Sequence, residues 1–141
     1  MTAAQGPAPG FHRHPDHHIS IHKANGSWCA QDGESVLAES DRARILEETG
    51  HGAVVYFPIE DVRDENLIPS PTETTCPFKG RAKYFRSVSR PDGPDIAWSY
   101  PSTYNEVLAV EGYIAFYTER ISVENINLES TVEKKVEQSN C

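Results

Sequence analysis

The sequence predicts an all-β domain with minor α content, built as a folded antiparallel sheet with one or two short helices. Three observations carry this prediction. Short runs rich in β-branched and aromatic residues recur between residues 18 and 121, Pro and Gly separate these runs, and little of the chain has a helical pattern. A chain of 141 residues with ten Pro and nine Gly is typical of one turn-rich domain.

The first expected strands follow one another closely. Residues 19–22 alternate between apolar and polar side chains, and Asn25-Gly26 predicts a hairpin turn into residues 27–30. Asp32-Gly33 predicts a second turn, which leads to a strand at residues 35–38.

Residues 42–48 allow two interpretations. Ser40 could cap a short helix that ends at Gly50. Alternatively, residues 50–52 form a hairpin loop that joins this segment to residues 53–57. We favour the hairpin, because the sequence Ala-Val-Val-Tyr-Phe at 53–57 is strongly typical of a strand.

The segment after Pro58 begins with a short turn at residues 59–62. Residues 63–80 include three prolines and predict an 18-residue loop, a length that usually signifies function inside a small domain. A short helix is expected at residues 104–110. Three further strands are expected at residues 82–88, 95–100 and 112–121.

The last of these strands has the clearest alternation. One face carries Tyr113, Ala115 and Tyr117, and the opposite face carries Ile114 and Phe116.

Composition excludes several classes of protein. The chain has 21 acidic and 13 basic residues, a net charge of −8, which disfavours nucleic-acid binding. No apolar run reaches the ~20 residues of a membrane span, and the N-terminus lacks the apolar segment of a secretory signal. We therefore expect a soluble cytoplasmic protein without a membrane or nucleic-acid partner.

The three cysteines are too few and too scattered for a disulfide framework or a Cys-x-x-Cys zinc site. They are Cys29, Cys76 and Cys141. We expect no disulfide, no structural zinc and no cofactor.

Both ends of the chain are polar. Residues 1–17 are rich in Pro, Gly and His, and we expect a disordered tail. Residues 122–141 form a second polar tail, which starts with a possible strand to about Leu128. Five of the six histidines fall within eleven residues: His12, His14, His17, His18 and His22. We interpret most of this cluster as solvated, with adventitious metal affinity. His18 and His22, however, enter the first strand on one face, and one of them is a candidate for a structural role.

The first candidate site is the sequence Cys76-Pro77-Phe78-Lys79-Gly80. A nearby cation such as Lys79 can lower the pKa of a thiol, although a lone Cys is more often a small buried hydrophobic residue. Pro77 and Gly80 would fix an unusual backbone that aims neighbouring side chains into a cleft.

Two other groups are candidates. Asp61 lies one turn beyond the strand that carries Tyr56, where burial could suit a carboxylate for acid/base chemistry; a capping role in the turn is equally compatible. Several aromatic side chains on neighbouring strands could line a ligand pocket or simply fill the core. They are Tyr56, Tyr84, Trp98, Tyr100, Tyr113 and Tyr117.

These motifs, in this order, resemble the DUF427 family of unknown function, which is also catalogued as a nucleotidyltransferase-like domain. The resemblance spans about residues 18–121. Its main motifs are Leu46-Glu47-Glu48, Val55-Tyr56-Phe57-Pro58, Glu60-Asp61-Val62, Cys76-Pro77-Phe78-Lys79-Gly80, Ala97-Trp98-Ser99-Tyr100 and Gly112–Tyr117. The family pattern usually has Tyr where this chain has Phe78 and Arg where it has Ile59.

The resemblance implies a β-tent, the folded antiparallel architecture of methionine-sulfoxide reductase B and a zinc-bearing Rab exchange factor. The Cys-x-x-Cys zinc pairs of those relatives are missing here. Nucleotidyl transfer usually needs paired magnesium-binding carboxylates beside a Gly-Ser phosphate loop, and this constellation is also missing.

The leading functional hypothesis is a cofactor-independent enzyme that acts on a small organic molecule by acid/base chemistry, as an isomerase, cyclase, dehydratase or hydrolase. Glu47 or Asp61 would be the base, Lys79 would stabilise an anion, and Tyr56 or Tyr100 would donate a proton. Phe78, Tyr84 and Trp98 would complete an aromatic ligand pocket.

We expect the Lys79 ammonium to face a cavity shared with Tyr56, Asp61 or Trp98. Two alternatives remain open: a non-catalytic module that binds a small molecule or a partner, and a thiol enzyme that depends on Cys76.

Overall fold

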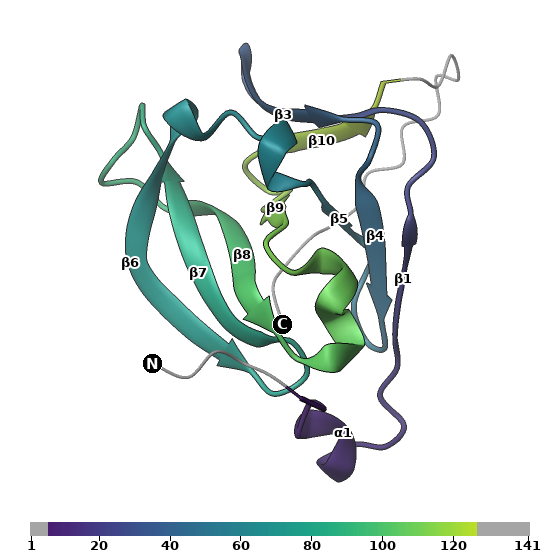
Figure 1. The fold of residues 1–141 in the computed structure, drawn as a ribbon. Helices are drawn as coiled ribbons and strands as arrows, with labels where there is room; N and C mark the ends of the chain where they lie inside the picture. Colours follow the sequence, from purple (N-terminus) through teal and green to yellow (C-terminus); the bar gives the residue numbers. More distant parts are fainter. Residues whose placement is uncertain (1–5, 127–141) are drawn as a thin grey trace.

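The computed structural model describes residues 6–126, which form three antiparallel sheets joined by short helices (Figure 1). The first sheet has the order β1-β4-β5: β1 (Ile19–Lys23), β4 (Arg44–Glu48) and β5 (Val54–Tyr56). The second has the order β10-β2-β3: β10 (Ser122–Asn125), β2 (Trp28–Asp32) and β3 (Ser35–Ser40). The third has the order β6-β7-β8-β9: β6 (Leu67–Cys76), β7 (Gly80–Ser87), β8 (Asp95–Thr103) and β9 (Ile114–Phe116).

The helices of the described residues are short. They are α1 (Gly10–Arg13) and the 3₁₀ helices η1 (Ile59–Asp61), η2 (Asp64–Asn66) and η3 (Asn105–Val110). Within residues 6–126, no helix is long and apolar enough to cross a membrane. The all-β prediction is confirmed, and η3 lies where the short helix was expected.

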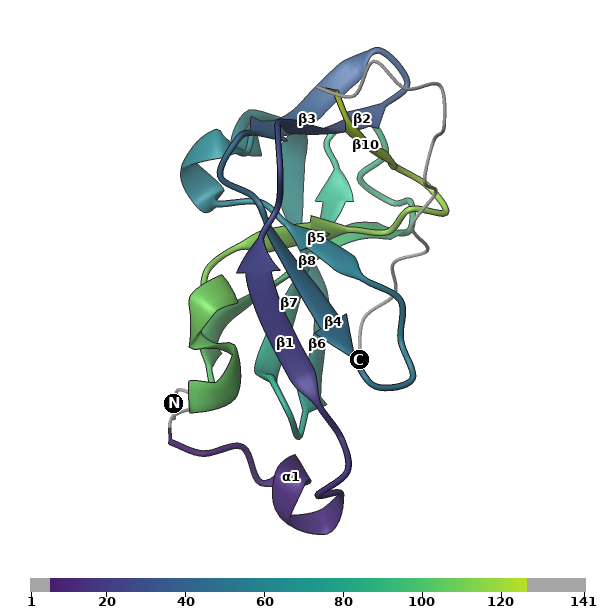
Figure 2. The same cartoon turned by 90° about the vertical axis from the view of Figure 1, so that its right-hand side faces the viewer.

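The first and third sheets lie on opposite sides of the interior, and the second sheet closes one end (Figures 1 and 2). At the other end, η3 lies between the two facing sheets and α1 lies below them. This end of the molecule holds the candidate site.

The core divides into two apolar clusters because neighbouring residues of the central strands point in opposite directions. In β8, Ala97 belongs to one cluster and its neighbour Trp98 to the other. In β9, Ile114 and Phe116 lie in the first cluster, while Ala115 lies in the second together with Tyr113 and Tyr117. The two faces expected for residues 113–117 are therefore confirmed.

The hairpin interpretation of residues 42–48 is also confirmed. β4 pairs with β5 in antiparallel register, with Arg44 opposite Tyr56 and Leu46 opposite Val54. Gly50 has a φ of 81°, a left-handed conformation that favours glycine in the connecting turn.

The hairpin expected at Asn25-Gly26 is wrong. β1 pairs with β4, whereas β2 pairs with β3 and β10, so the chain passes from one sheet to another at this point. The Ala24 amide donates to the Ala43 carbonyl at 2.9 Å, directly after the last residue of β1, and the chain then leaves the first sheet. A local turn signal cannot show which strand becomes the partner.

The irregular loop expected at residues 63–80 is wrong as well. Most of this segment is β6, a ten-residue edge strand that pairs with β7. Its register shifts between Pro69 and Glu73, because proline cannot donate a ladder hydrogen bond and is tolerated at edges and bulges.

The last expected strand, residues 112–121, is regular only over β9, and β10 follows after a turn. The end of the polar C-terminal segment, from residue 127 onward, lies outside the described residues.

The Tyr56 hydroxyl and the Trp98 indole form a hydrogen bond inside the second cluster. Trp98 Nε1–H donates to the hydroxyl at 3.1 Å, and both side chains are fully buried. We predict that Tyr56→Phe lowers the free energy of unfolding by about 1–3 kcal/mol at neutral pH, because the buried indole N–H loses its acceptor. Tyr104→Phe is the control, because Tyr104 is half-exposed. Equal stability of the two variants in chemical denaturation would contradict this assignment.

The same pair predicts a pH dependence. Burial raises the pKa of Tyr56 from its ordinary value of 10.0, so the folded protein keeps this proton where the unfolded chain loses it. The unfolded chain then binds fewer protons, and the stability associated with Tyr56 falls as the pH rises above about 10. The stability difference between wild type and Tyr56→Phe should therefore shrink between pH 9 and 11.

Candidate functional site

Glu48 is a buried carboxylate at the end of β4. Alternation along the strand places Leu46 and Glu48 on the inner side and Glu47 on the outer side. Glu48 is 7% exposed, whereas the Glu47 side chain is 58% exposed. The inward carboxylate needs partners, because an unpaired buried charge is strongly destabilising.

Lys79 supplies the first partner. It lies in the tight turn between β6 and β7, where the Lys79 amide donates to the Cys76 carbonyl and Gly80 has a φ of 129°. This turn directs the Lys79 side chain inward, where it is 3% exposed and its Nζ lies 2.5 Å from Glu48 Oε1. Burial lowers the pKa of Lys79, and the Glu48 carboxylate partly offsets this effect.

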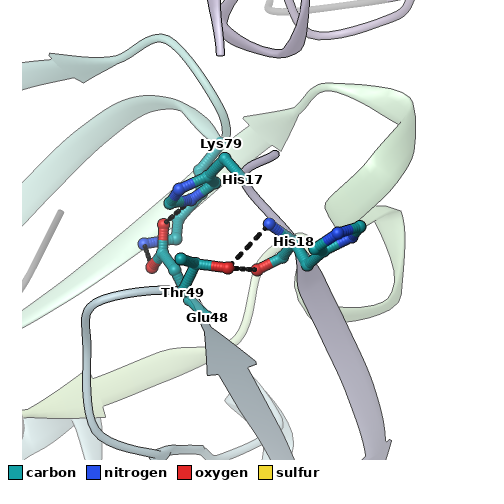
Figure 3. A network of polar contacts seen from close by, with 5 residues as sticks. All are labelled: His17, His18, Glu48, Thr49 and Lys79. Carbon is teal, nitrogen blue, oxygen red and sulfur yellow. Dashed lines mark hydrogen bonds and ion pairs between the residues drawn. The ribbon is translucent and has the colours of Figure 1, made fainter. Parts of the chain in front are cut away.

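His17 supplies the second partner (Figure 3). Its Nε2 lies 2.8 Å from Glu48 Oε2, so each oxygen of the carboxylate has its own partner. The imidazole also stacks on the Phe78 ring, with centroids 3.9 Å apart and planes 19° from parallel. Since a carboxylate accepts hydrogen bonds, Nε2 carries the hydrogen of this bond, and in the neutral form of the imidazole Nδ1 keeps a lone pair. No described residue forms a hydrogen bond with Nδ1.

His17 ends a segment that we call the strap, residues 6–17. We expected residues 1–17 to be a disordered tail, but the described part packs on the domain. The Gly10 amide donates to the Pro77 carbonyl at 2.9 Å, and the Phe11 ring meets Phe78 edge to face at 5.0 Å. A Cβ on Gly10 would lie 2.7 Å from the Phe78 ring, so only glycine fits without rearrangement.

A cavity of about 470 Å³ lies beside the imidazole, and we call it the His17 cavity. It is lined by Arg13, His14, Pro15, Asp16, His17, Thr49 and Phe78. Thr49 also fixes the start of β1, because its Oγ1 accepts a hydrogen bond from the His18 amide at 2.9 Å (Figure 3). The cavity is large enough for a small organic molecule.

Two of the predicted site residues belong to this site: Lys79 contacts Glu48, and Phe78 contacts His17. The Lys79 ammonium does not line the His17 cavity; it points at Glu48 instead of a cavity shared with Tyr56, Asp61 or Trp98.

The other predicted acids lie elsewhere. Glu47 is exposed and pairs with His22 at 2.9 Å. Asp61 accepts hydrogen bonds from Ser40 at 2.6 Å and Arg42 at 3.1 Å, beside a separate cavity of about 330 Å³. Its contacts tie η1 to the turn between β3 and β4.

The predicted aromatic residues lie in the second core cluster. Tyr56, Trp98 and Tyr100 are fully buried there. Tyr84 is buried with its hydroxyl 2.8 Å from Thr74 Oγ1. Their surroundings are those of core aromatics, which was the alternative left open by the sequence.

The prediction that no cysteine forms a disulfide is wrong at Cys76, which is disulfide-bonded and buried. A bonded sulfur is not a thiolate, so this state does not favour the thiol-enzyme alternative. Cys29 is a free buried thiol whose pKa is raised by burial, and Cys141 lies outside the described residues. Among residues 6–126, no group of three or more His, Cys, Asp and Glu side chains is placed to hold a metal ion.

Sequence reasoning missed Glu48 and His17. The alternation of side chains along β4 could have identified Glu48, because Glu48 lies on the same strand face as the apolar Leu46. His17 had no such signal. Its position depends on a contact with Phe78, 61 residues further along the chain.

We predict that Lys79→Met lowers the free energy of unfolding by about 3–5 kcal/mol, because it leaves Glu48 buried with one partner removed. The control is Lys83→Met, which breaks an exposed pair with Glu73 at 3.4 Å and should cost less than about 1 kcal/mol. Similar losses for both variants in urea denaturation would show that the Lys79 pair is not structural.

Comparison with known proteins assigns the chain to a family. No curated protein matched it. A family model described as a domain of unknown function (DUF427) matches residues 20–127, which include β1 to β10 except the first residue of β1. Glu48, Phe78 and Lys79 lie inside the matched span, and the strap precedes it. The chain therefore belongs to the DUF427 family.

Proposed function

We propose that this protein is a cofactor-independent enzyme that acts on a small organic molecule by acid/base chemistry, with His17 as the proton acceptor. One observation carries the proposal. The imidazole is held by Glu48 on one nitrogen and by Phe78 on its face, beside a cavity of about 470 Å³. A base oriented by a carboxylate next to a substrate-sized cavity is the arrangement that general-base catalysis requires.

The proton path follows from the tautomer. A substrate in the His17 cavity gives a proton to Nδ1, and the ring becomes an imidazolium while its Nε2–H stays on Glu48. The ionised carboxylate stabilises this cation without taking the proton. Return of the proton to another substrate atom completes an isomerisation, and its delivery to a leaving group completes an elimination. In a hydrolysis, Nδ1 takes the proton from the water that attacks the substrate and passes it to the leaving group.

Lys79 and Phe78 act as positioning residues in this proposal. The Lys79 ammonium holds Glu48 Oε1 and leaves Oε2 for the imidazole. Phe78 fixes the plane of the ring. A base held in this way loses little entropy when it reacts.

A general probe of proton abstraction tests the proposal while the natural substrate is unidentified. The compound 5-nitrobenzisoxazole is flat and opens in one step when a base removes its carbon-bound proton, with no cofactor. We predict that His17→Gln reduces the protein-catalysed rate about 100-fold, the usual scale of general-base catalysis. Glutamine can still donate to Glu48, so the variant should stay folded.

The matched control is His22→Gln. His22 also pairs with a glutamate at 2.9 Å, but on the exposed surface. It should leave the rate unchanged. Equal rates for wild type and His17→Gln, with both proteins folded by circular dichroism, would contradict a catalytic role for His17.

A further inference from the structure

The strap makes the kind of contacts that a bound peptide makes. Its backbone forms three hydrogen bonds with the domain, at Gly6, Ala8 and Gly10. The Asn105 amide donates to the Gly6 carbonyl at 2.8 Å, and the Ala8 amide donates to Glu106 Oε1 at 2.9 Å. The third bond, from the Gly10 amide to the Pro77 carbonyl, is 2.9 Å long. Backbone hydrogen bonds of this type provide affinity in peptide recognition.

Two ring side chains of the strap contact one buried residue of the domain, Phe78. Phe11 and His17 both contact the Phe78 ring, with centroids 5.0 Å and 3.9 Å away. His17 also forms a hydrogen bond with the buried carboxylate of Glu48. A few aromatic anchors dominate the energy of most interfaces.

The strap contributes little to the core of the domain. The buried members of both apolar clusters come from residues 24–123, so none of them belongs to the strap, which meets the second cluster at Phe78 through the rings of Phe11 and His17. The family match begins at residue 20. α1 has four residues and no side-chain cap. A segment with so few core contacts can open while the rest of the fold stays intact.

We infer that the strap occupies a peptide-binding groove of the DUF427 domain and can be exchanged for a separate peptide of the same chemistry. The groove is defined by Glu48, Pro77, Phe78, Asn105 and Glu106. It selects a peptide with an aromatic residue, a histidine six positions later, and a glycine directly before the aromatic residue. This inference does not depend on catalysis by His17.

The glycine requirement provides the test. In the full-length chain, Gly10→Val places side-chain atoms where the Phe78 ring and the Pro77 carbonyl lie, and so displaces the strap. A fluorescent synthetic peptide with the sequence of residues 6–17, GPAPGFHRHPDH, is then titrated into the variant and followed by fluorescence anisotropy. Since the wild-type strap competes for the groove, the peptide should bind the variant at least ~10-fold more tightly than the wild type.

A second variant and a control peptide complete the experiment. His17→Ala removes this imidazole from the strap without adding bulk. The fluorescent peptide of residues 6–17 should bind this variant as well. A peptide with alanine in place of both anchors should bind neither variant. The inference is overturned if the folded variants do not bind the peptide, if both variants unfold, or if the anchor-less peptide binds equally well.

Discussion

A carboxylate without access to bulk water must be surrounded by hydrogen-bond donors. The Glu48 carboxylate meets this constraint with donors from two other segments, so that three distant segments of the chain come together. β4 brings the acid, the turn between β6 and β7 brings Lys79, and the strap brings His17. β4 belongs to the first sheet and the turn to the third, so the ion pair joins the two facing sheets at the end of the molecule that holds η3. Removal of one partner leaves a buried charge uncompensated, which couples the three segments.

The surrounding residues follow from this arrangement. Phe78 precedes Lys79 in the turn, and its ring provides a flat surface for the imidazole. Gly10 has no side chain because the strap passes directly over that ring. The strap contacts the pair through His17, and the burial of Glu48 and Lys79 strengthens the electrostatic interactions between them. Packing and the proposed proton chemistry therefore depend on the same few contacts.

The sequence could predict those features that depend on local patterns. Alternation assigned the two faces of residues 113–117, and the strand pattern of residues 53–57 supported the hairpin between β4 and β5. Lys79 and Phe78 were singled out because Pro77 and Gly80 surround them with backbone constraints. Pairing between distant segments was not predictable. Prolines at 69 and 71 concealed the edge strand β6, and the docking of a Pro-, Gly- and His-rich strap depends on a surface formed by other parts of the chain.

The central claim is that Glu48 joins the strap to the domain through His17, and a double-mutant cycle tests it most directly. Wild type, His17→Ala, Glu48→Gln and the double variant are compared by urea denaturation. The loss of the Lys79 partner occurs in both Glu48→Gln proteins and cancels in the cycle. The account predicts a coupling free energy of at least about 1 kcal/mol between the two positions. Additive effects, within about 0.3–0.5 kcal/mol, would contradict it.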